Sequence, residues 1–579
     1  MAGDAFRRLV ARTLSKKYGK EMEEACAPYQ YALSTRAGTE CVNHLLRAAT
    51  QADPENTILS VDGIGAYDTI SRRVMLQKLL TFPKAKAMLP FVFLSYGQPS
   101  QYLWFDDEGK GNPVPQGEGG EQGDPLMPGF FSLGQHNALE AIAAELLLTE
   151  TLCAFLDDIY VVCRPERVAT VYALVERHLY EHAGIKLNMG KTEVYNTGGT
   201  KPEGVDALQP LEPEAERVWV GDRSLPEEQQ GVLVLGAPVG TQAFADKHGE
   251  DKLQGERKLL ELVAELPDLQ CAWNLLLMCC GPRATYHLRA QPPAQVRKYA
   301  EGHDQALWTT LCKLLGREDL GDDTESTAAQ LATLPMRMGG LGLRSATRTR
   351  PAAYWASWAD TLPMMSTRNP NLAQGFLQQL EGGQPQVGCL QQATAAKAEV
   401  EAAGYRCPAW RAVWEGQRPE QVADAEPGEW RHGWQYYAAT QLDKQHRDRA
   451  ILPSMTLASR ALVRSQAGRG AGAHLTALPV DEARTLKPHL LRVVLLRRLR
   501  LQLPLDTRTC KCGGCVDTLG DHRSACPTVG KLARRAMPLE RTWARVYREA
   551  GATVLQNYLL RELNLEEHLQ ADDGENWKW

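Results

Sequence analysis

Two adjacent aspartates, Asp157 and Asp158, stand inside an otherwise apolar, β-forming run, CAFLDDIYVV, at residues 153–162. Neighbouring carboxylates oppose each other's ionisation, and removing a carboxylate from water is costly unless something neutralises it. A bound cation is the obvious partner. We therefore interpret the pair as metal ligands, with a solvated turn as the structural alternative.

A third carboxylate, Asp62, follows a separate β-branched run, TILSV, at residues 57–61. If the two runs are neighbouring strands of one sheet, all three carboxylates share one patch. Together they offer enough oxygen ligands for two Mg²⁺ ions about 3.5–4 Å apart, an arrangement that stabilises attacking and leaving oxygens in phosphoryl transfer. The structural alternative for Asp62 is a helix cap.

The surrounding pattern predicts the elements that position these carboxylates. LCAFL and IYVVC form a hairpin with the aspartates at or near its tip. Asp124 followed by Pro125 predicts the start of a long helix after a glycine-rich acidic loop over 106–123. The other expected elements are helices over 6–26, 39–50, from about 69, 167–184 and 244–320, and strands at 57–61 and 231–240.

Bulk properties indicate a folded protein of three or four domains, since the chain has 579 residues and 44% apolar content. No apolar run reaches the roughly 20 residues needed to span a bilayer, so we expect neither membrane insertion nor secretion. The formal charge of −5 argues against a nucleic-acid binder on average. Residues 484–549, however, carry fifteen Lys or Arg against five Asp or Glu.

Five segments in order resemble the consecutive palm motifs of reverse transcriptases: SVDGIGAYD, EQGDPLMPGF, CAFLDDIYVV, IKLNMGKTEVYN and VLVLGAPVGT. FLDD is similar to the family's Phe/Tyr-x-Asp-Asp box. The likeness is to non-LTR (LINE-like) retrotransposons of the class with a C-terminal restriction-like endonuclease, and it runs from about Phe6 to Glu562.

The resemblance implies an α+β right-hand polymerase, with partial fingers, a palm with an antiparallel sheet, a helical thumb, a helical region and a small zinc-knuckle segment. The corresponding boundaries are 1–56 for the fingers helices, 57–243 for the palm, 244–350 for the thumb, 351–485 for a helical linker region of unassigned role, 486–550 for the basic zinc segment and 551–579 for a nuclease lead-in and acidic tail.

The same resemblance assigns Asp62, Asp157 and Asp158 to two catalytic Mg²⁺ ions. Tyr67 matches the bulky residue that blocks a ribose 2′-OH, which favours deoxynucleotides. Lys191, in GKT, matches a lysine near the leaving pyrophosphate, where an ammonium neutralises developing charge or donates a proton. A solvent-facing lysine is the alternative for Lys191.

Further positions follow from the resemblance. Gln122 and Gly123 match the nucleotide-binding Gln-Gly pair; the earlier pair at 116–117 competes, but no Asp-Pro and helix follow it. The thumb-like stretches suggest Arg283 and Arg289 as phosphate contacts. The segment expected to hold the primer end contains Leu235, Gly236 and Gly240.

The cysteine-rich segment CKCGGCVDTLGDHRSAC has the spacing C-x₂-C-x₆-H-x₃-C, formed by Cys512, Cys515, His522 and Cys526, with Cys510 as a spare ligand. This spacing suits a tetrahedral, structural Zn²⁺ site. It resembles the Cys-Cys-His-Cys knuckle of the same retrotransposon class. A reduced loop without metal is the alternative.

The likeness also contains departures. In the family, fingers strands precede the point where this chain begins and a nuclease core follows the point where it ends, so we expect both to be truncated and predict no DNA cleavage. The basic frame around the cysteines contains Trp543 and Tyr547, which suit phosphate contact with base stacking; a helix with a solvated basic face explains the arginines equally well.

Three hypotheses follow. The first is an RNA-directed DNA polymerase with an RNA template, a DNA primer or target and dNTPs as partners. The second is a catalytically inactive remnant that only binds nucleic acid, and the third is a metal-dependent enzyme acting on another substrate. No membrane partner is expected, and the oligomeric state stays open. Nuclear rather than cytoplasmic residence is implied only by the family.

Overall fold

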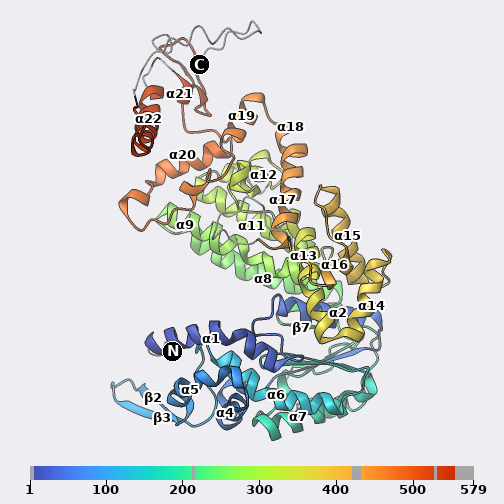
Figure 1. The fold of residues 1–579 in the computed structure, drawn as a ribbon. Coiled ribbons are helices and arrows are strands. Elements are labelled where there is room, and N and C mark those ends of the chain that lie inside the picture. The colour runs from blue at the N-terminus through green and yellow to red at the C-terminus, as the bar shows by residue number, and fades with distance from the viewer. Residues whose placement is uncertain are drawn as a thin grey trace. The chain divides into compact units, whose positions relative to one another are not determined.

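The computed structural model describes residues 5–210, 216–321, 323–419, 432–526, 528 and 531–554. The chain divides into two compact units, residues 1–485 and 486–579 (Figure 1). Unit 1 contains a small antiparallel sheet and most of the helices, and unit 2 contains the cysteine-rich segment. The acidic tail expected after residue 561 lies outside the described residues.

The sheet of unit 1 has four strands in the order β4-β5-β1-β6, and all neighbours are antiparallel. Its strands are β1 (Thr57–Val61), β4 (Thr151–Phe155), β5 (Asp158–Cys163) and β6 (Glu193–Tyr195). The expected strand at 57–61 and the expected hairpin are both confirmed. Only two residues, Leu156 and Asp157, connect β4 to β5.

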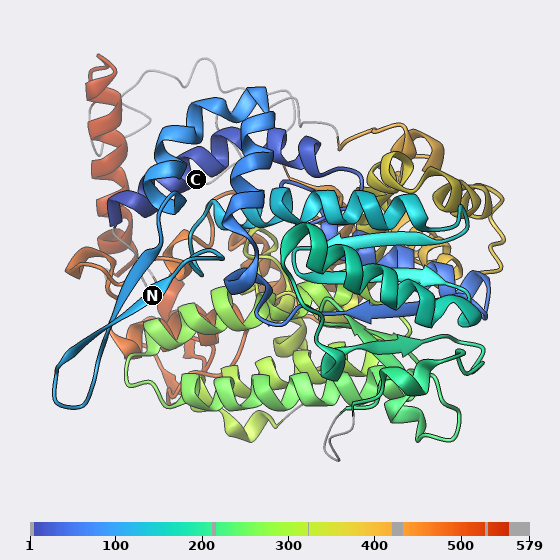
Figure 2. The ribbon, with the colours of Figure 1, turned by 90° about the horizontal axis from the view of Figure 1, so that it is seen from below.

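Two hydrophobic cores pack against opposite faces of this sheet, because side chains alternate along each strand. Leu59 and Val161 belong to one core, and Ile58 and Val162 belong to the other. Helices α6 and α7 cover one face of the sheet, and α2 and α13 cover the other (Figures 1 and 2). The first core includes residues of α6 and α7, and the second includes residues of α2 and α13. These helices are α2 (Gly38–Ala52), α6 (Met127–Glu145), α7 (Val168–Ala183) and α13 (Ala346–Arg368).

The N-terminal part of unit 1 differs from expectation in one element. β2 (Ser100–Phe105) and β3 (Gly111–Gln116) form a hairpin where we expected a glycine-rich loop from residue 106. Asp106 organises its turn by accepting hydrogen bonds from the backbone N–H groups of Glu108 and Lys110. The neighbouring helices are α1 (Ala5–Cys26), α3 (Ala66–Thr69), α4 (Arg72–Thr81) and α5 (Leu89–Tyr96).

The expectation of a single strand over 231–240 is wrong. The segment folds into a hairpin of β7 (Gly231–Val234) and β8 (Ala237–Gly240). Leu235 and Gly236 form its turn with φ of 49° and 79°. Two consecutive left-handed residues are typical of a tight hairpin turn, and glycine meets the requirement without steric cost.

Helices make up the rest of unit 1, as expected for 244–320 and beyond. They are α8 (Gln242–Ala264), α9 (Leu269–Leu275), α10 (Thr285–Ala290), α11 (Arg297–Leu315), α12 (Thr327–Thr333), α13, α14 (Pro370–Glu381), α15 (Gly388–Ala402), α16 (Trp410–Trp414), α17 (Trp434–His446), α18 (Leu452–Ser454) and α19 (Leu457–Ser465). No helix in the described part of the chain combines the length and apolar character needed to cross a lipid bilayer.

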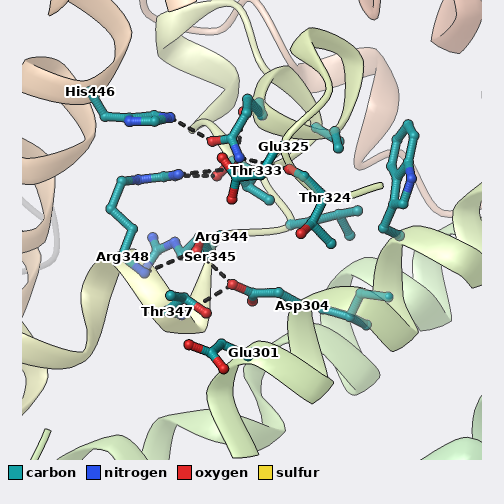
Figure 3. A pocket seen from close by; sticks show the side chains of 16 residues that line it. Glu301, Asp304, Thr324, Glu325, Thr333, Arg344, Ser345, Thr347, Arg348 and His446 are labelled. Carbon is teal, nitrogen blue, oxygen red and sulfur yellow. Dashed lines mark hydrogen bonds between the residues drawn. The ribbon is translucent and has the colours of Figure 1, made fainter. Parts of the chain in front are cut away.

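A cavity of about 420 Å³ lies among α11, α12, α13 and α17 (Figure 3). On its wall, Asp304 accepts hydrogen bonds from the Ser345 hydroxyl and from the backbone N–H groups of Ala346 and Thr347, at the start of α13. Arg348 pairs with Asp443 and bonds to Thr333. The charged groups of this wall therefore fix the helices around it.

Unit 2 is organised around its cysteine-rich segment. Arg497 and Arg500 both pair with Asp521, which joins the first helix of the unit to the short helix after the cysteines. The elements are α20 (Pro488–Arg498), β9 (Arg508–Thr509), β10 (Cys515–Val516), α21 (Asp521–Ala525) and α22 (Lys531–Glu549).

Candidate functional site

Backbone pairing brings the three predicted carboxylates to one end of the sheet. β1 and β5 pair Val61 with Ile159, so the next position in this register places Asp62 opposite Asp158. Asp157 lies in the adjoining two-residue turn. A cavity of about 540 Å³ opens at this end of the sheet. Its lining comprises Asp62, Gly63, Gly65, Ala66, Tyr67, Asp68, Gln122, Gly123, Asp124, Met127, Pro128, Asp157 and Lys191.

The electrostatics of the carboxylates favour a cation. Burial, together with the charges of Asp157 and Asp62, raises the pKa of Asp158 to about 6. Burial and the Asp62 charge also raise the pKa of Asp157. Lys191 partly offsets this repulsion, with its Nζ 3.0 Å from Asp62 Oδ2, although two-thirds of the lysine side chain is exposed.

The donor set fits Mg²⁺, which prefers carboxylate oxygens. Within the described part of the chain, oxygens from the three aspartates do not all lie within 4.8 Å of one another. Side-chain rotation about a backbone that already holds Asp62, Asp157 and Asp158 together would close them around ions. The chemistry open to such a site is metal-assisted transfer of a phosphoryl or nucleotidyl group.

A buried glutamine supports the turn that carries Asp157. Leu156 adopts a left-handed conformation with φ of 56°, and its N–H donates to Gln30 Oε1 at 2.8 Å. Gln30 is 1% exposed, and its amide nitrogen donates to Gln135 of α6. No local pattern predicts this support, because Gln30 lies more than a hundred residues before the turn.

The loop before α6 carries the predicted Gln-Gly pair into the cavity wall. Gln122 and Gly123 line the cavity, whereas Gln116 ends β3 and is absent from the lining. Backbone approach explains one glycine of this loop. A Cβ on Gly119 would lie 2.3 Å from the backbone of Asp68, so no side chain fits there.

Tyr67 lies flat against Phe131 of α6, with ring centroids 4.6 Å apart and planes 3° from parallel. Burial, with a smaller contribution from Asp157, raises the pKa of its hydroxyl, which therefore stays protonated at neutral pH. The ring forms part of the cavity wall. A rigid aromatic wall suits a steric filter for a sugar ring.

The helix after the Gln-Gly pair begins later than expected, at Met127. Asp124 is therefore not the N-cap residue of this helix, and its carboxylate instead links three other segments. One of its oxygens accepts from the backbone N–H of Leu126 at 2.9 Å, and the other accepts from Tyr96 at 2.7 Å and Arg7 at 3.3 Å. These bonds tie α1 and α5 to the loop that lines the cavity.

The hairpin turn expected to hold a primer end is tied to the sheet and to the helical region. The Leu235 N–H donates to the Tyr160 hydroxyl at 3.2 Å, and Tyr286 donates to the Leu235 carbonyl at 2.7 Å. Sequence reasoning missed both tyrosines. A signal for Tyr160 existed: it follows Asp158 by two residues, so both side chains point to the same face of β5.

One expected phosphate contact is wrong. Arg289 Nε lies 2.6 Å from Glu40, and its Nη2 lies 3.1 Å from Asp360, in a largely buried ion-paired group. The guanidinium is therefore committed to joining α10 with α2 and α13. Arg283 is exposed, and its role stays a prediction.

The cysteine cluster of unit 2 differs from expectation by one ligand. Ligand atoms of Cys510, Cys512, His522 and Cys526 lie within 4.8 Å of one another, and Cys515 lies outside this group. The pairs Cys510–Cys526 and Cys512–His522 are 3.7 and 3.4 Å apart. The reason is the β9–β10 hairpin, which pairs Cys515 with Thr509 and leaves the other two cysteines in its turn.

Three thiols and an imidazole fit Zn²⁺. Hydrogen bonds from the Cys512 backbone and then from the His522 side chain lower the pKa of Cys510 to about 6, which favours the thiolate that a metal requires. The set differs from the expected knuckle by exchange of Cys515 for Cys510.

Comparison with known proteins agrees with this geometry. Residues 4–239 match the family model described as "Reverse transcriptase (RNA-dependent DNA polymerase)". The chain is 25% identical to the Retrotransposable element SLACS 132 kDa protein of Trypanosoma brucei gambiense over 321 residues. This matched region is 55% of the chain. The chain spans about a quarter of the length of that relative.

Residues 4–239 therefore contain a reverse transcriptase domain, and the relative that the chain resembles is a retrotransposon protein. Its assignment to the class with a C-terminal endonuclease stays a prediction.

Two solved structures show a weak likeness. A telomerase from Candida albicans in complex with a TWJ fragment of telomeric RNA has a TM-score of 0.30 and 13% identity, covering 63% of this chain and 58% of that chain. An apo telomerase from Candida tropicalis has a TM-score of 0.27 and 9% identity, covering 63% and 60%. These scores are too low to support an argument about this chain.

Proposed function

We propose that this protein is an RNA-directed DNA polymerase, which joins deoxynucleotides to the 3′-OH of a primer. The observation that carries the proposal is the register of β1 and β5. It sets Asp62 opposite Asp158, beside Asp157 and at the edge of a cavity lined by Tyr67 and the Gln-Gly loop. The match to the reverse transcriptase family over this same part of the chain supports it.

Each side chain then has a role in nucleotide addition. Asp62, Asp157 and Asp158 would hold two Mg²⁺ ions, which when bound activate the primer hydroxyl and offset charge on the reacting phosphate. Tyr67 excludes a ribose 2′-OH. Lys191, released from its contact with the aspartate, neutralises or protonates the departing pyrophosphate.

Backbone groups of two turns would position the template strand and the primer strand of the nucleic acid. The loop containing Gln122 and Gly123 lets template and incoming nucleotide approach closely, since Gly123 has a left-handed φ of 88°. The β7–β8 turn, with Leu235, Gly236 and then Gly240 at the end of β8, supports the primer end. Both turns are anchored by hydrogen bonds to the body of unit 1.

Primer extension on an RNA template with Mg²⁺ and dNTPs tests the proposal. We expect extension by the native chain and a loss of at least about a hundredfold for Asp157→Asn, because a lost metal ligand removes several kcal/mol of transition-state stabilisation. Asp206→Asn, at an exposed carboxylate outside the cavity lining, is the matched control. Equal activity of the Asp157 variant and the native chain would exclude the proposed site.

A second function, nucleic-acid binding without polymerisation, is favoured by unit 2. Trp543 and Tyr547 lie on α22 with ring centroids 5.8 Å apart and half-exposed side chains, in a strongly basic segment. Exposed aromatic rings among arginines suit base stacking with phosphate contact. Salt-dependent RNA binding by a chain that incorporates no nucleotide under any template and primer combination would support this reading.

A further inference from the structure

A second group of metal-ligating side chains lies on α7. His178, Glu181 and His182 occupy positions i, i+3 and i+4 of the helix, which place them on one face. A ligand atom from each lies within 4.8 Å of the other two. None of the three lines the cavity beside Asp62, so the group is separate from the site described above.

The surroundings of His178 determine which ring nitrogen carries its proton. His178 Nε2 lies 2.7 Å from Glu145 Oε1 and 3.0 Å from Arg177 Nη2, and that guanidinium nitrogen also lies 2.5 Å from the same carboxylate oxygen. An ionised carboxylate only accepts hydrogen bonds, and a guanidinium only donates them. Glu145 therefore requires a proton on His178 Nε2, whereas Arg177 requires that Nε2 carry none.

The other ring nitrogen of His178, Nδ1, indicates which of the two tautomers is present. His178 Nδ1 is inaccessible to solvent and has no hydrogen-bond partner in the described part of the chain. If Nε2 accepted from Arg177, Nδ1 would carry a buried, unpaired N–H, and leaving such a donor unpaired costs about 1–3 kcal/mol. If Nε2–H donates to Glu145, Nδ1 presents a lone pair. The shorter contact, to Glu145, agrees with the second arrangement.

We propose that His178 Nδ1, His182 and Glu181 bind a divalent transition-metal ion, of which Zn²⁺ is the first choice. Imidazole nitrogen and carboxylate oxygen are ligands that Zn²⁺ accepts, and three protein ligands leave one position for water. Glu145 is the positioning residue, since a carboxylate that accepts from the far nitrogen of a ligating histidine fixes its tautomer and orientation.

The accessible ligands have freedom to complete the site. Glu181 is exposed and His182 is partly exposed, while His178 is 8% exposed and held in place. The two imidazole rings already lie in a stacked arrangement with centroids 5.6 Å apart. Arg177 brings a positive charge near the site, and the two glutamates offset it.

The site would fasten two helices of the layer beneath the sheet. Glu145 is the last residue of α6, and the three ligands lie in the C-terminal half of α7. A metal ion bound there therefore strengthens the contact between these helices without touching the polymerase cavity. The proposal is independent of the polymerase function, because it requires neither nucleic acid nor nucleotide.

Zinc counting on the full chain tests the site. The native chain and His182→Ala are dialysed against the same buffered Zn²⁺ solution, and bound metal is measured by mass spectrometry. We expect the native chain to retain one more zinc ion than the variant, since the cysteine cluster is intact in both. His489→Ala, at an exposed histidine of α20, should retain as much as the native chain. Equal counts for native and His182→Ala would overturn the proposal.

Glu145→Gln separates metal binding from an ordinary surface contact. The amide still reaches His178 but no longer supplies the negative charge that selects the tautomer, so we expect zinc affinity to fall by about 10–100-fold. Added Zn²⁺ should raise the unfolding temperature of unit 1 in the native chain and not in His182→Ala. Unchanged affinity in Glu145→Gln would remove its positioning role, and equal thermal shifts in both chains would count against the site.

Discussion

At the turn between β4 and β5, Asp157 and Asp158 are held beside Asp62 against their mutual repulsion. Backbone pairing places them there, and burial, with a smaller effect from the neighbouring carboxylates, raises the pKa of both adjacent aspartates. Lys191 relieves only part of the repulsion from its exposed position. For single residues, the backbone therefore gathers the three carboxylates before any substrate arrives, and rotation of their side chains brings the oxygens around a cation.

Tyr67→Ala tests the steric filter. Removing the ring that lies on Phe131 opens room beside the sugar of an incoming nucleotide. We expect discrimination between dGTP and GTP to fall by about 10–200-fold, the range found when an apolar pocket accommodates or excludes one methylene-sized group. The measurement is the ratio of kcat/KM values in primer extension. Tyr180→Ala, at an exposed tyrosine of α7, is the control. An unchanged ratio would show that Tyr67 only packs beside the strand end.

Exchange of single cysteines decides the ligand set in unit 2. Cys510 lies in the cluster with His522, and Cys515 lies outside it. We therefore expect Cys510→Ser to reduce zinc retained by the cysteine segment and Cys515→Ser to leave it unchanged, as measured by zinc release during titration with a competing chelator. The opposite ranking would restore the ligand set expected from sequence spacing.

At the scale of elements, local signals predicted the parts of the fold that depend on neighbouring residues. The run TILSV and the apolar runs around the two aspartates gave the strands and the tight turn, since alternation and turn length are local properties. The exchange of Cys510 for Cys515 and the β7–β8 turn depend on backbone pairing that spacing does not reveal. Gln30 and Tyr286 act on turns far along the chain, and only tertiary packing brings them there.

Strand β6 yields a prediction on pH. Burial, with a smaller effect from Glu216, raises the pKa of Glu193 to about 7. The pKa of Glu193 is higher in the folded chain than in the unfolded chain. Its contribution to the free energy of unfolding is therefore fully present below about pH 4.5 and is lost as the pH rises through 7, by roughly 3 kcal/mol for one such group. Glu193→Gln should remove most of this loss.

Urea unfolding at pH 5 and pH 8 measures the difference between the two chains. We expect the free energy of unfolding of Glu193→Gln to exceed that of the native chain at pH 8. The difference between the two chains should be smaller at pH 5. Glu228→Gln, at an exposed acid of unit 1, should show no such pattern. An equal difference in free energy of unfolding at both pH values would indicate that the substitution acts through packing rather than through charge.

At the scale of the whole molecule, charge is distributed unevenly between the two units. The chain carries a formal charge of −5, although residues 484–549 alone have an excess of ten basic groups. The proposed polymerase would hold nucleic acid by its phosphates, and phosphate contact depends on clustered Lys and Arg rather than on net charge. Unit 2 therefore supplies a basic surface that the composition of the full chain conceals.

Arg534 and Arg541, both exposed on α22, test this role of unit 2. If each contacts a phosphate of single-stranded RNA, replacing both with Gln should reduce the slope of log K against log salt by about 1.4, at about 0.7 for each contact. Lys201→Gln with Lys247→Gln removes the same charge from unit 1, where each lysine already pairs with an aspartate, and should leave the slope unchanged. Equal slopes for both double variants would mean that net charge, and not the basic surface of α22, governs binding.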